Sequence, residues 1–260
     1  MHTLRSFARI LDRHTLAVSV LAVASTWLCL RTGVVADLPS VLIGVAVIFP
    51  IVFSINAAYK RREDALGYLA SAKGHAVAIA WAHRDWTGEE GSAALARQGR
   101  ERIGAIFEAI RAYFVAEGGN DALSEVYRRL SGLSASHESL RAAGVPANEV
   151  SRVNQYLRAI IIDFERMRNI LEYRTPMALR AYSRVFLNTF PVLFGPYFAP
   201  IALESAPAVG YAVAVVFSLV LVSLDNIQDA LENPYDTVGE DDVDLDVAEE
   251  LDALLAQEVR

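Results

Sequence analysis

The residues around His83 are where metal binding or acid–base catalysis would first be sought. His83, Asp85 and Glu89 follow one another closely, with Trp81 and Trp86 beside them. A zinc or proton-transfer site needs a further ligand converging from elsewhere, which this spacing does not supply, and such a cluster is typical of a solvated helix end. The chain also lacks a G-x-x-x-x-G-K-S/T phosphate loop, an H-E-x-x-H zinc motif and a G-x-S-x-G nucleophile turn. We therefore expect a protein that is not an enzyme and has no catalytic residue.

A second pattern consists of bulky apolar residues at every fourth position. Val45, Phe49 and Phe53 would form one narrow stripe on a helix, and Pro50 removes a backbone donor from that helix. The stripe has two interpretations. It packs against a neighbouring helix, as in many membrane proteins, or it lines a pore when several copies surround an axis. In a pore, stacked rings of these residues would make a dry constriction, where the partly positive phenyl edges face an anion.

Hydrophobic segments would have to position this stripe. The chain has 260 residues, 53% apolar and 21% charged, and its mean hydropathy of +0.28 is high for a soluble domain. The apolar residues gather in four segments, 15–35, 38–58, 185–203 and 207–224. Each is close to the ~20 residues with which a helix crosses about 30 Å of hydrocarbon. The first segment is too long for a typical signal-peptide core, so we expect four transmembrane helices.

Cations flank these segments unevenly. Arg and Lys precede the first segment, follow the second and precede the third, whereas the short linkers 31–37 and 204–206 contain few of them. By the positive-inside rule, both termini and the large insert are cytoplasmic, which predicts a multi-pass protein of the plasma or inner membrane. The net charge of −7 reflects acidic residues that crowd the C-terminal tail. The expected surroundings are a lipid bilayer, and no nucleic-acid partner is expected.

The insert between the second and third segments has helical periodicity. Ile103, Ile106, Ile110 and Phe114 illustrate the spacing, and no stretch alternates long enough to predict a strand. We expect insert helices over residues 59–81, 87–117, 120–131 and 148–173. The chain is thus divided into residues 1–58 with two transmembrane helices, a cytoplasmic helical insert at 59–182, two more transmembrane helices at 183–228, and an acidic tail at 229–260. An amphipathic helix at the end of that tail would pack on the insert or on a neighbouring subunit.

The end of the second hydrophobic segment resembles a known family. Residues 54–63 read S-I-N-A-A-Y-K-R-R-E, similar to the Phe-x-Asn-Asn-Ala-x-Tyr-x-Arg stretch that ends the second membrane helix of bestrophins. With Arg61 in the place of the family arginine, the three neck residues of that family fall on the stripe. The resemblance also implies polar or basic residues beside the pore, and it marks a divergent, bacterial-type member because Arg62 and Glu63 replace the usual Trp-Trp pair. These predicted pore-adjacent residues are Asn56, Lys60, Arg61 and Arg62.

The C-terminal tail carries a second match to the same family. Residues 231–235, L-E-N-P-Y, are followed by an acidic run, similar to the Glu-Asn-Pro-Phe-Gly segment and acidic run of bestrophins. In animal members this run binds calcium, and clustered carboxylates are what a hard cation requires. The alternative is a solvated acidic tail that binds no metal. The calcium ligands implied by the resemblance are Asn233, Glu240, Asp241, Asp242 and Asp244.

A third, shorter match precedes the third hydrophobic segment. The sequence R-T-P-M at 174–177, leading to Tyr182, is similar to the Thr-Pro-x-Pro-x-x-Tyr stretch by which bestrophins enter their third span. In that family this stretch approaches the cytoplasmic exit of the pore. The resemblance therefore implies a second constriction, a cytoplasmic aperture, at Thr175.

Together these matches imply an all-α membrane protein with four transmembrane helices per subunit and a cytoplasmic helical domain. It would be a homopentamer around a central pore and would conduct chloride-type anions passively. The alternative is a non-conducting oligomeric scaffold or sensor that binds a partner through its insert and tail. A membrane enzyme with a polar pocket around His83 or the tail is the third possibility.

Overall fold

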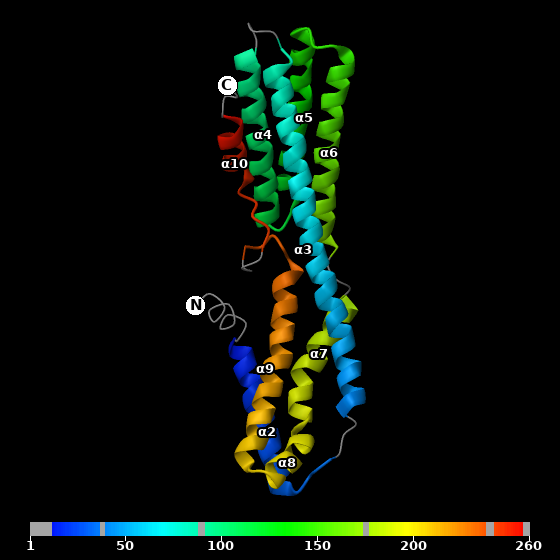
Figure 1. Cartoon of the computed structure of the whole chain (residues 1–260), viewed down its shortest axis with the longest axis vertical. Helices are drawn as coiled ribbons and strands as arrows, with labels where there is room; N and C mark the ends of the chain where they lie inside the picture. The colour runs from blue at the N-terminus through cyan, green and yellow to red at the C-terminus, as the bar shows by residue number, and fades with distance from the viewer. Residues whose placement is uncertain (1–11, 37–39, 88–91, 174–176, 238–241, 257–260) are drawn as a thin grey trace. The chain divides into compact units, whose positions relative to one another are not determined.

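The computed structural model describes residues 12–36, 40–87, 92–173, 177–237 and 242–256. Within these residues the regular secondary structure is helical throughout, which confirms the predicted all-α class (Figure 1). The chain divides into two compact units, the first formed by residues 1–60 and 174–232 and the second by residues 61–173 and 233–260. The helices are α2 (Arg13–Thr32), α3 (Ser40–Asp85), α4 (Ser92–Val115), α5 (Asn120–Ala142), α6 (Ala147–Glu172), α7 (Met177–Leu193), α8 (Gly195–Glu204), α9 (Pro207–Glu232) and α10 (Val247–Leu255).

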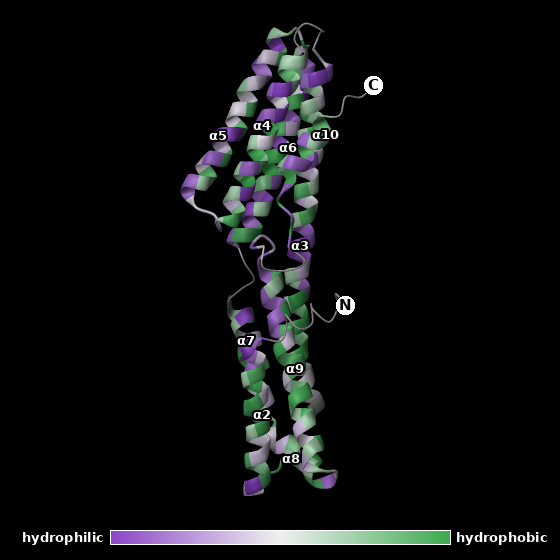
Figure 2. Ribbon diagram, turned by 90° about the vertical axis from the view of Figure 1, so that its left-hand side faces the viewer, coloured by the Kyte–Doolittle hydropathy of each residue, from purple (hydrophilic) through white to green (hydrophobic). Residues whose placement is uncertain are grey.

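The first unit holds the hydrophobic helices. Among the described residues, three helical segments are long and apolar enough to cross a membrane: Arg13–Thr32, Ala178–Glu204 and Pro207–Glu232. Hydrophobic residues dominate α2 and α9, whereas hydrophilic residues recur along α4, α5 and α6 of the second unit (Figure 2). The predicted second span covers residues 38 and 39, which are outside the described residues, and continues into the first half of α3. The fourth transmembrane helix therefore remains a prediction.

Two small apolar clusters hold the first unit together. One joins Ala22 of α2 to Phe194, Phe198 and Ala214 around α8 and α9. The other joins α3 to α7 and α9 through Ile51, Leu187 and Leu221. Because lipid is as apolar as these side chains, close packing must supply much of the association between the helices.

Two glycines allow the helices of this unit to approach closely. A Cβ atom on Gly195 would lie 2.3 Å from Ser25 Oγ and 2.9 Å from the Ser25 backbone carbonyl carbon, and one on Gly210 would lie 2.5 Å from Ala202 Cβ. All three distances are shorter than real Cβ contacts. The packing of α8 on α2 and of α9 on α8 therefore requires glycine at these positions.

The structure corrects two predicted helix boundaries. The predicted span 185–203 is divided at Phe194, where α7 ends and α8 begins with Gly195 and Pro196. The predicted span 38–58 and the predicted insert helix 59–81 are one helix, α3, of 46 residues. The change from apolar to charged residues near Lys60 marked a change of surroundings and did not mark a helix end. Pro50 lies inside this helix.

The second unit is a helical bundle with a large apolar core. Its core is formed by the inward faces of α4, α5 and α6 and of the second half of α3, and α10 adds Val247 and Leu251 to the same core. The tail helix thus packs on the insert of its own chain, one of the two places predicted for it. The largest fully buried side chains of this core are Tyr113, Phe107, Phe114, Phe164 and Tyr235.

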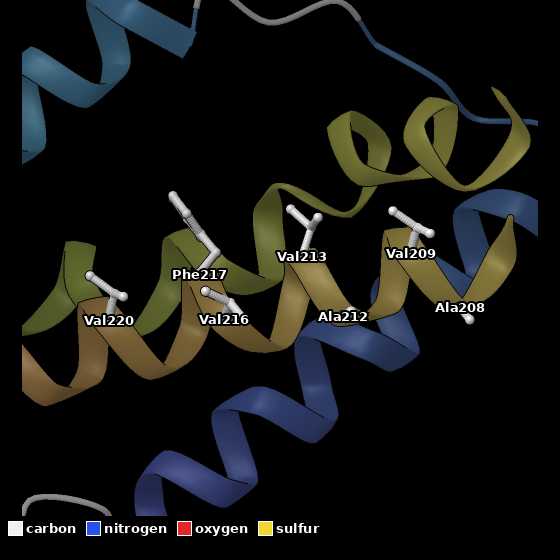
Figure 3. A pocket seen from close by; sticks show the side chains of 7 residues that line it. All are labelled: Ala208, Val209, Ala212, Val213, Val216, Phe217 and Val220. Carbon is white, nitrogen blue, oxygen red and sulfur yellow. The ribbon is translucent and has the colours of Figure 1, made fainter. Parts of the chain in front are cut away.

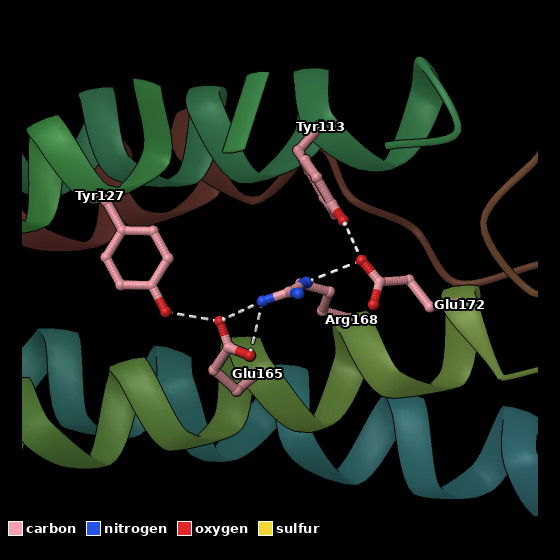
Figure 4. A network of polar contacts seen from close by, with 5 residues as sticks. All are labelled: Tyr113, Tyr127, Glu165, Arg168 and Glu172. Atoms are coloured by element: carbon pink, nitrogen blue, oxygen red, sulfur yellow. Dashed lines mark hydrogen bonds and ion pairs between the residues drawn. The ribbon is translucent and has the colours of Figure 1, made fainter. Parts of the chain in front are cut away.

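A polar network ties three helices of this bundle together (Figure 4). Arg168 of α6 donates from Nε to Glu172 at 2.8 Å and from Nη1 to Glu165 at 2.9 Å. Tyr127 of α5 donates its hydroxyl to Glu165, and Tyr113 of α4 donates to Glu172 at 3.3 Å. Burial, with the bond to Glu165, raises the pKa of Tyr127 to about 12. The bond from Arg168 lowers the pKa of Glu172, so the Glu172 carboxylate is charged at neutral pH.

The segment after α9 is anchored in the second unit by Tyr235. Its ring is fully buried, packs on Phe114 with 4.3 Å between ring centroids, and directs its hydroxyl to the Met167 carbonyl oxygen at 3.3 Å. Asn233 forms a local turn, because its Oδ1 accepts the Tyr235 backbone N–H at 3.3 Å. These contacts explain why a buried aromatic residue follows the Asn-Pro pair.

Candidate pore-lining face of helix α3

Two phenylalanines of α3 are exposed on the surface of the chain. Phe49 is 61% exposed and Phe53 is 60% exposed. Their rings meet edge to face, with 5.3 Å between centroids, the arrangement that aromatic quadrupoles favour. An aromatic pair of this size left uncovered by its own chain must face lipid, another subunit or a pore.

The opposite face of the same helix is buried. Ile51, Ser54 and Ala58 are at most 1% exposed. At about 100° per residue, they lie roughly half a helical turn from the two phenylalanines. The buried face continues through Ala65, Leu69, Ala72, Ala76 and Ile79. Because Ile51 packs on α7 and α9, α3 presents Phe49 and Phe53 outward from the first unit.

Asn56 and Lys60 lie on the phenylalanine face. Both side chains are exposed, and the spacing 49, 53, 56, 60 follows one side of an α-helix. We call Phe49, Phe53, Asn56 and Lys60 the exposed face of α3. Along it, the side chains change from aromatic to polar to cationic within about three turns.

The other two residues predicted beside the pore have different surroundings. Arg61 lies on the buried side of α3 and donates from Nη2 to the Ile170 carbonyl oxygen of α6. Arg62 pairs with Glu63 at 2.6 Å. Of the predicted basic residues, Lys60 therefore shares the exposed face, while Arg61 contacts the insert. Charge alone could not distinguish them in the sequence, but the helical spacing from Phe53 could.

Two further predicted site residues cannot be placed. Val45 belongs to α3, but its side chain lies outside the described residues. Thr175 lies wholly outside them. Both assignments remain predictions from the sequence.

The environment of His83 differs from the prediction. His83 is fully buried, so the predicted solvated helix end is wrong. Its Nδ1–H donates to the Ile79 carbonyl oxygen at 2.9 Å, and its ring centroid lies 5.6 Å from that of His137 on α5. Asp85 instead pairs with Arg84 at the helix end, and Glu89 is outside the described residues. His137 could not be predicted as its neighbour, because it lies 54 residues away in the sequence and no motif links the pair.

A polar cluster at one end of the first unit was also missed. Asp225 of α9 is 5% exposed and accepts the Asn188 side-chain N–H of α7 at 2.9 Å. His14 Nε2 lies 2.7 Å from Asn188 Oδ1, and Arg184 pairs with Asp229. The cluster thus joins the start of α2, the middle of α7 and the last third of α9. Ionisable groups inside apolar helices are expensive unless paired, and here hydrogen bonds and an arginine compensate them.

The described part of the acidic tail does not form a cation site. Asn233 is buried with its oxygen engaged in the local turn, and Asp244 Oδ1 accepts the Asp246 backbone N–H at 2.9 Å. Among the described residues, no group of three His, Cys, Asp or Glu side chains is arranged to hold a metal. Asp242 is partly buried, and Glu240 and Asp241 lie outside the described residues. The described residues alone do not fit calcium.

An apolar groove of about 570 Å³ runs along α9. Figure 3 shows Val209, Val213, Phe217 and Val220 projecting to one side of α9, with α2 on the other side. The lining is almost free of polar atoms. Such a surface is suited to lipid chains or to another apolar helix.

Comparison with known proteins places this architecture. No family model matches the sequence, and no curated protein matches it. Among solved structures, a bacterial bestrophin homologue from Klebsiella pneumoniae matches with a TM-score of 0.74 and 16% identity, over 93% of this chain and 94% of that chain. A single-substitution variant of the homologue matches with a TM-score of 0.76 and 16% identity, over 96% of this chain and 97% of that chain. The structure of a membrane protein variant matches with a TM-score of 0.77 and 15% identity, over 92% of this chain and 97% of that chain.

These matches cover nearly the whole of both chains. The class of the molecule is therefore an all-helical protein with apolar helices of membrane-spanning length. More particularly, the chain has the fold of the bacterial bestrophin homologues. The resemblance predicted from its sequence is confirmed at the level of fold, and the 15–16% identity explains why no sequence comparison detects it.

Proposed function

We propose that this protein is a subunit of a homopentameric anion channel that conducts chloride-type ions passively through a neck of Val45, Phe49 and Phe53. The single observation that carries the proposal is the exposed face of α3, on which the polar residues Asn56 and Lys60 follow two uncovered phenylalanines. Phe49 and Phe53 stay uncovered by their own chain although the opposite face of the helix is buried. Symmetric copies of α3 around an axis would bring these rings together, and the bestrophin fold supports such an assembly.

The chemistry of this face suits a monovalent anion. An ion passing a ring of phenyl groups loses part of its hydration shell, and phenyl edges offer it a partly positive surface. Lys60 follows on the same face and would raise the local concentration of anions at the end of the neck. Asn56, between them, supplies an amide N–H donor. The sequence of aromatic, amide and ammonium groups therefore favours anions over cations.

The proposed surroundings are a plasma or inner membrane with four spans per subunit and both chain termini in the cytoplasm. His14 at the start of α2 contacts Asn188 in the second half of α7, and Asn188 contacts Asp225 in the last third of α9. The start of α2 thus lies toward the C-terminal part of α9, which agrees with a cytoplasmic location for both, where the sequence concentrates its cations. The second unit would form the cytoplasmic domain.

Reconstituted liposomes test the proposal. Purified protein should give chloride efflux that needs no ATP, and the double variant Phe49→Ala, Phe53→Ala should raise the efflux about tenfold, because removal of the rings lowers the dehydration barrier by ~1.4 kcal/mol. Val216→Ala, an exposed apolar truncation on α9, is the matched control and should leave the flux unchanged. Absence of flux in both the native protein and the double variant would rule out the channel.

The oligomeric state distinguishes the alternative. Native mass spectrometry should give a pentamer for the channel. A monomer or dimer would favour the non-conducting scaffold or sensor. So would an oligomer in which deletion of the tail abolishes partner binding without altering chloride flux.

A further inference from the structure

The second unit contains a polar pocket that the proposed channel does not use. It has a volume of about 260 Å³ and lies between α3 and α6. Its α3 wall presents Arg61, Asp64 and Tyr68, which follow one another at intervals of about one helical turn. Its α6 wall presents Arg166 and Asn169. These positions follow one side of each helix at i, i+3 and i+7 spacing, so two regular helices build the pocket without a loop.

Both arginines are held in place at the pocket wall. Arg61 donates from Nη2 to the Ile170 carbonyl oxygen, which fixes its guanidinium between the two helices. The Arg166 guanidinium carbon lies 5.3 Å from the centroid of the Tyr68 ring, in cation–π contact. Its nearest carboxylate, Asp163, is 3.5 Å away, farther than the ~2.7–2.9 Å of a strong charge-assisted hydrogen bond. A guanidinium stacked on a ring keeps its N–H donors pointing outward in its own plane.

The charges of the wall favour an anion. The pocket lining has two guanidinium groups and one carboxylate, Asp64, with the Asn169 amide and Tyr68 hydroxyl as neutral donors, and Asp163 pairs with Arg166 beside it. Planar guanidinium groups match the oxygens of phosphate and carboxylate groups. The volume is below the ~300–1,000 Å³ of pockets for drug-sized ligands, and therefore suits a single small charged group.

The place of the pocket in the chain indicates the source of that group. Arg61 is three residues past residue 58, the end of the second hydrophobic segment, and α3 is continuous there. At ~1.5 Å per residue, Arg61 lies about 4–5 Å beyond that segment along the helix axis. If this part of α3 spans the bilayer, the arginine lies at the level of lipid headgroups, where basic pockets bind anionic lipids. Tyr173, 74% exposed, borders the same pocket and is of a type enriched at membrane interfaces.

We propose that the pocket between α3 and α6 binds a phosphate ester group, with Arg166 and Arg61 as its principal ligands and Tyr68 as the platform that orients Arg166. An anionic phospholipid headgroup or a free phosphate would supply the same chemistry. The lipid source rests on the proposed membrane span of α3, whereas the phosphate site itself rests on the pocket alone.

Binding to the purified full-length protein in non-ionic detergent tests this assignment. The probes are dioctanoyl phosphatidylglycerol, dioctanoylglycerol without a phosphate, and inorganic phosphate, each titrated by native mass spectrometry or calorimetry. We expect saturable binding of phosphatidylglycerol, at least tenfold weaker binding of dioctanoylglycerol, and at least tenfold weakening of phosphatidylglycerol binding in Arg166→Gln. Arg166→Lys should also weaken it, because the ammonium group keeps the charge but loses the planar contact with Tyr68.

Arg158→Gln is the matched control. Arg158 is exposed on the same helix, outside the pocket, so its loss should leave binding within about twofold of the native protein. Saturable binding of inorganic phosphate that depends on Arg166, with no preference for the lipid, would support the site and identify free phosphate as its ligand. Equal weakening by Arg158→Gln, or no saturable binding of either phosphate compound, would overturn the proposal.

The assay separates this proposal from the channel. Chloride flux through liposomes is measured on the same variants, and a protein without flux can still bind the headgroup. Should Arg166→Gln not give folded protein, Tyr68→Leu removes the platform and leaves both arginines, and it should weaken binding as Arg166→Lys does. Unchanged binding in Tyr68→Leu and Arg166→Lys would likewise overturn the assignment.

Discussion

At the scale of single residues, the position of Lys60 matters more than the number of basic residues around it. Lys60, Arg61 and Arg62 are consecutive in the sequence, yet a helix turns each of them to a different side. Only a residue on the side of Phe49 and Phe53 would act on an ion in the neck. This selects Lys60, because Arg61 contacts Ile170 and Arg62 pairs with Glu63.

The charge at Lys60 should therefore set the preference for anions. Lys60→Glu replaces a positive ring with a negative ring in the assembly, and we expect the chloride-to-potassium permeability ratio to fall about tenfold or more, corresponding to ~1.4 kcal/mol. Reversal potentials across planar bilayers with a salt gradient measure the ratio. Arg158→Glu makes the same charge change on an exposed position of α6 and should leave it unchanged. A similar effect of both variants would contradict the assignment of Lys60 to the pore.

The buried histidine pair makes a prediction about pH. Burial lowers the pKa of His83, with further lowering by the charges of His137 and Arg102, and burial also lowers the pKa of His137. The other polar groups against the pair are Ser136, 3.4 Å from His83 Nε2, and Asn154, 2.7 Å from His137 Nδ1. Both histidines are therefore neutral in the folded protein at a pH where free histidine is charged.

The sign of the pH effect follows from proton linkage. Because the folded-state pKa values lie below the ordinary value of 6.5, the unfolded chain binds more protons, and stability falls as the pH drops below about 6.5 until the lowered pKa is reached. We expect the melting temperature to decrease by several degrees between about pH 7.5 and pH 5. His137→Leu should reduce this decrease, whereas His75→Gln, a histidine stacked on Tyr156, should not. A decrease of equal size in all three proteins would assign the effect to other groups.

At the scale of helices, close packing in the first unit depends on glycine. Gly210→Ala would place a methyl group 2.5 Å from Ala202 Cβ and 3.0 Å from the Ala202 backbone. Because backbone atoms cannot move aside cheaply, we expect a loss of about 1–3 kcal/mol of stability, measured as a lower melting temperature in detergent. Gly104→Ala on α4 has nothing within 4 Å of its added Cβ and should be neutral or stabilising. Similar destabilisation by both variants would contradict the packing explanation, because the added Cβ at Gly104 has no neighbour to disturb.

Most of the helices could be predicted from the sequence, but their ends could not. Apolar blocks and helical periodicity locate helices because burial in lipid or in a core constrains side-chain type directly. Hydropathy does not report whether a helix continues, so the single helix α3 was predicted as two, since no glycine or proline separates Ala58 from Glu63. The interruption at Phe194 was missed because α7 and α8 together form one apolar block, so hydropathy does not change where the first helix ends.

The candidate site shows the same division between local and distant information. The stripe of Phe49 and Phe53 was predictable because its members lie on one helix and follow its period. The pairing of His83 with His137, the cluster around Asp225 and the pocket between α3 and α6 join residues that are far apart in sequence. Such contacts depend on how helices pack, which no local spacing reveals. The described structure supplied them.

At the scale of the whole molecule, the central question is which exposed apolar face meets water in the assembly. The chain leaves Phe53 on α3 and Val216 on α9 exposed to a similar degree, 60% and 59%. Exposure in one chain therefore cannot separate a pore from a lipid contact. The neighbouring residues distinguish a pore from a lipid contact. Asn56 and Lys60 follow the phenylalanines of α3, whereas the exposed side of α9 is lined by valines along the groove. Polar groups on a lipid-facing helix would be costly.

Cysteine labelling distinguishes the two faces in the reconstituted protein. The single native cysteine, Cys29, is buried, so background labelling should be low. We expect Asn56→Cys to react with a water-soluble, negatively charged thiol reagent at least tenfold faster than Val216→Cys, because water reaches the pore and not the acyl chains. Reaction at position 56 should also alter chloride flux, since the adduct projects into the conduction path. A positively charged reagent of the same size should react more slowly there, because Lys60 on the same face repels it. Equal labelling at the two positions, or fast labelling at position 56 with no change in flux, would place the exposed face of α3 outside the pore.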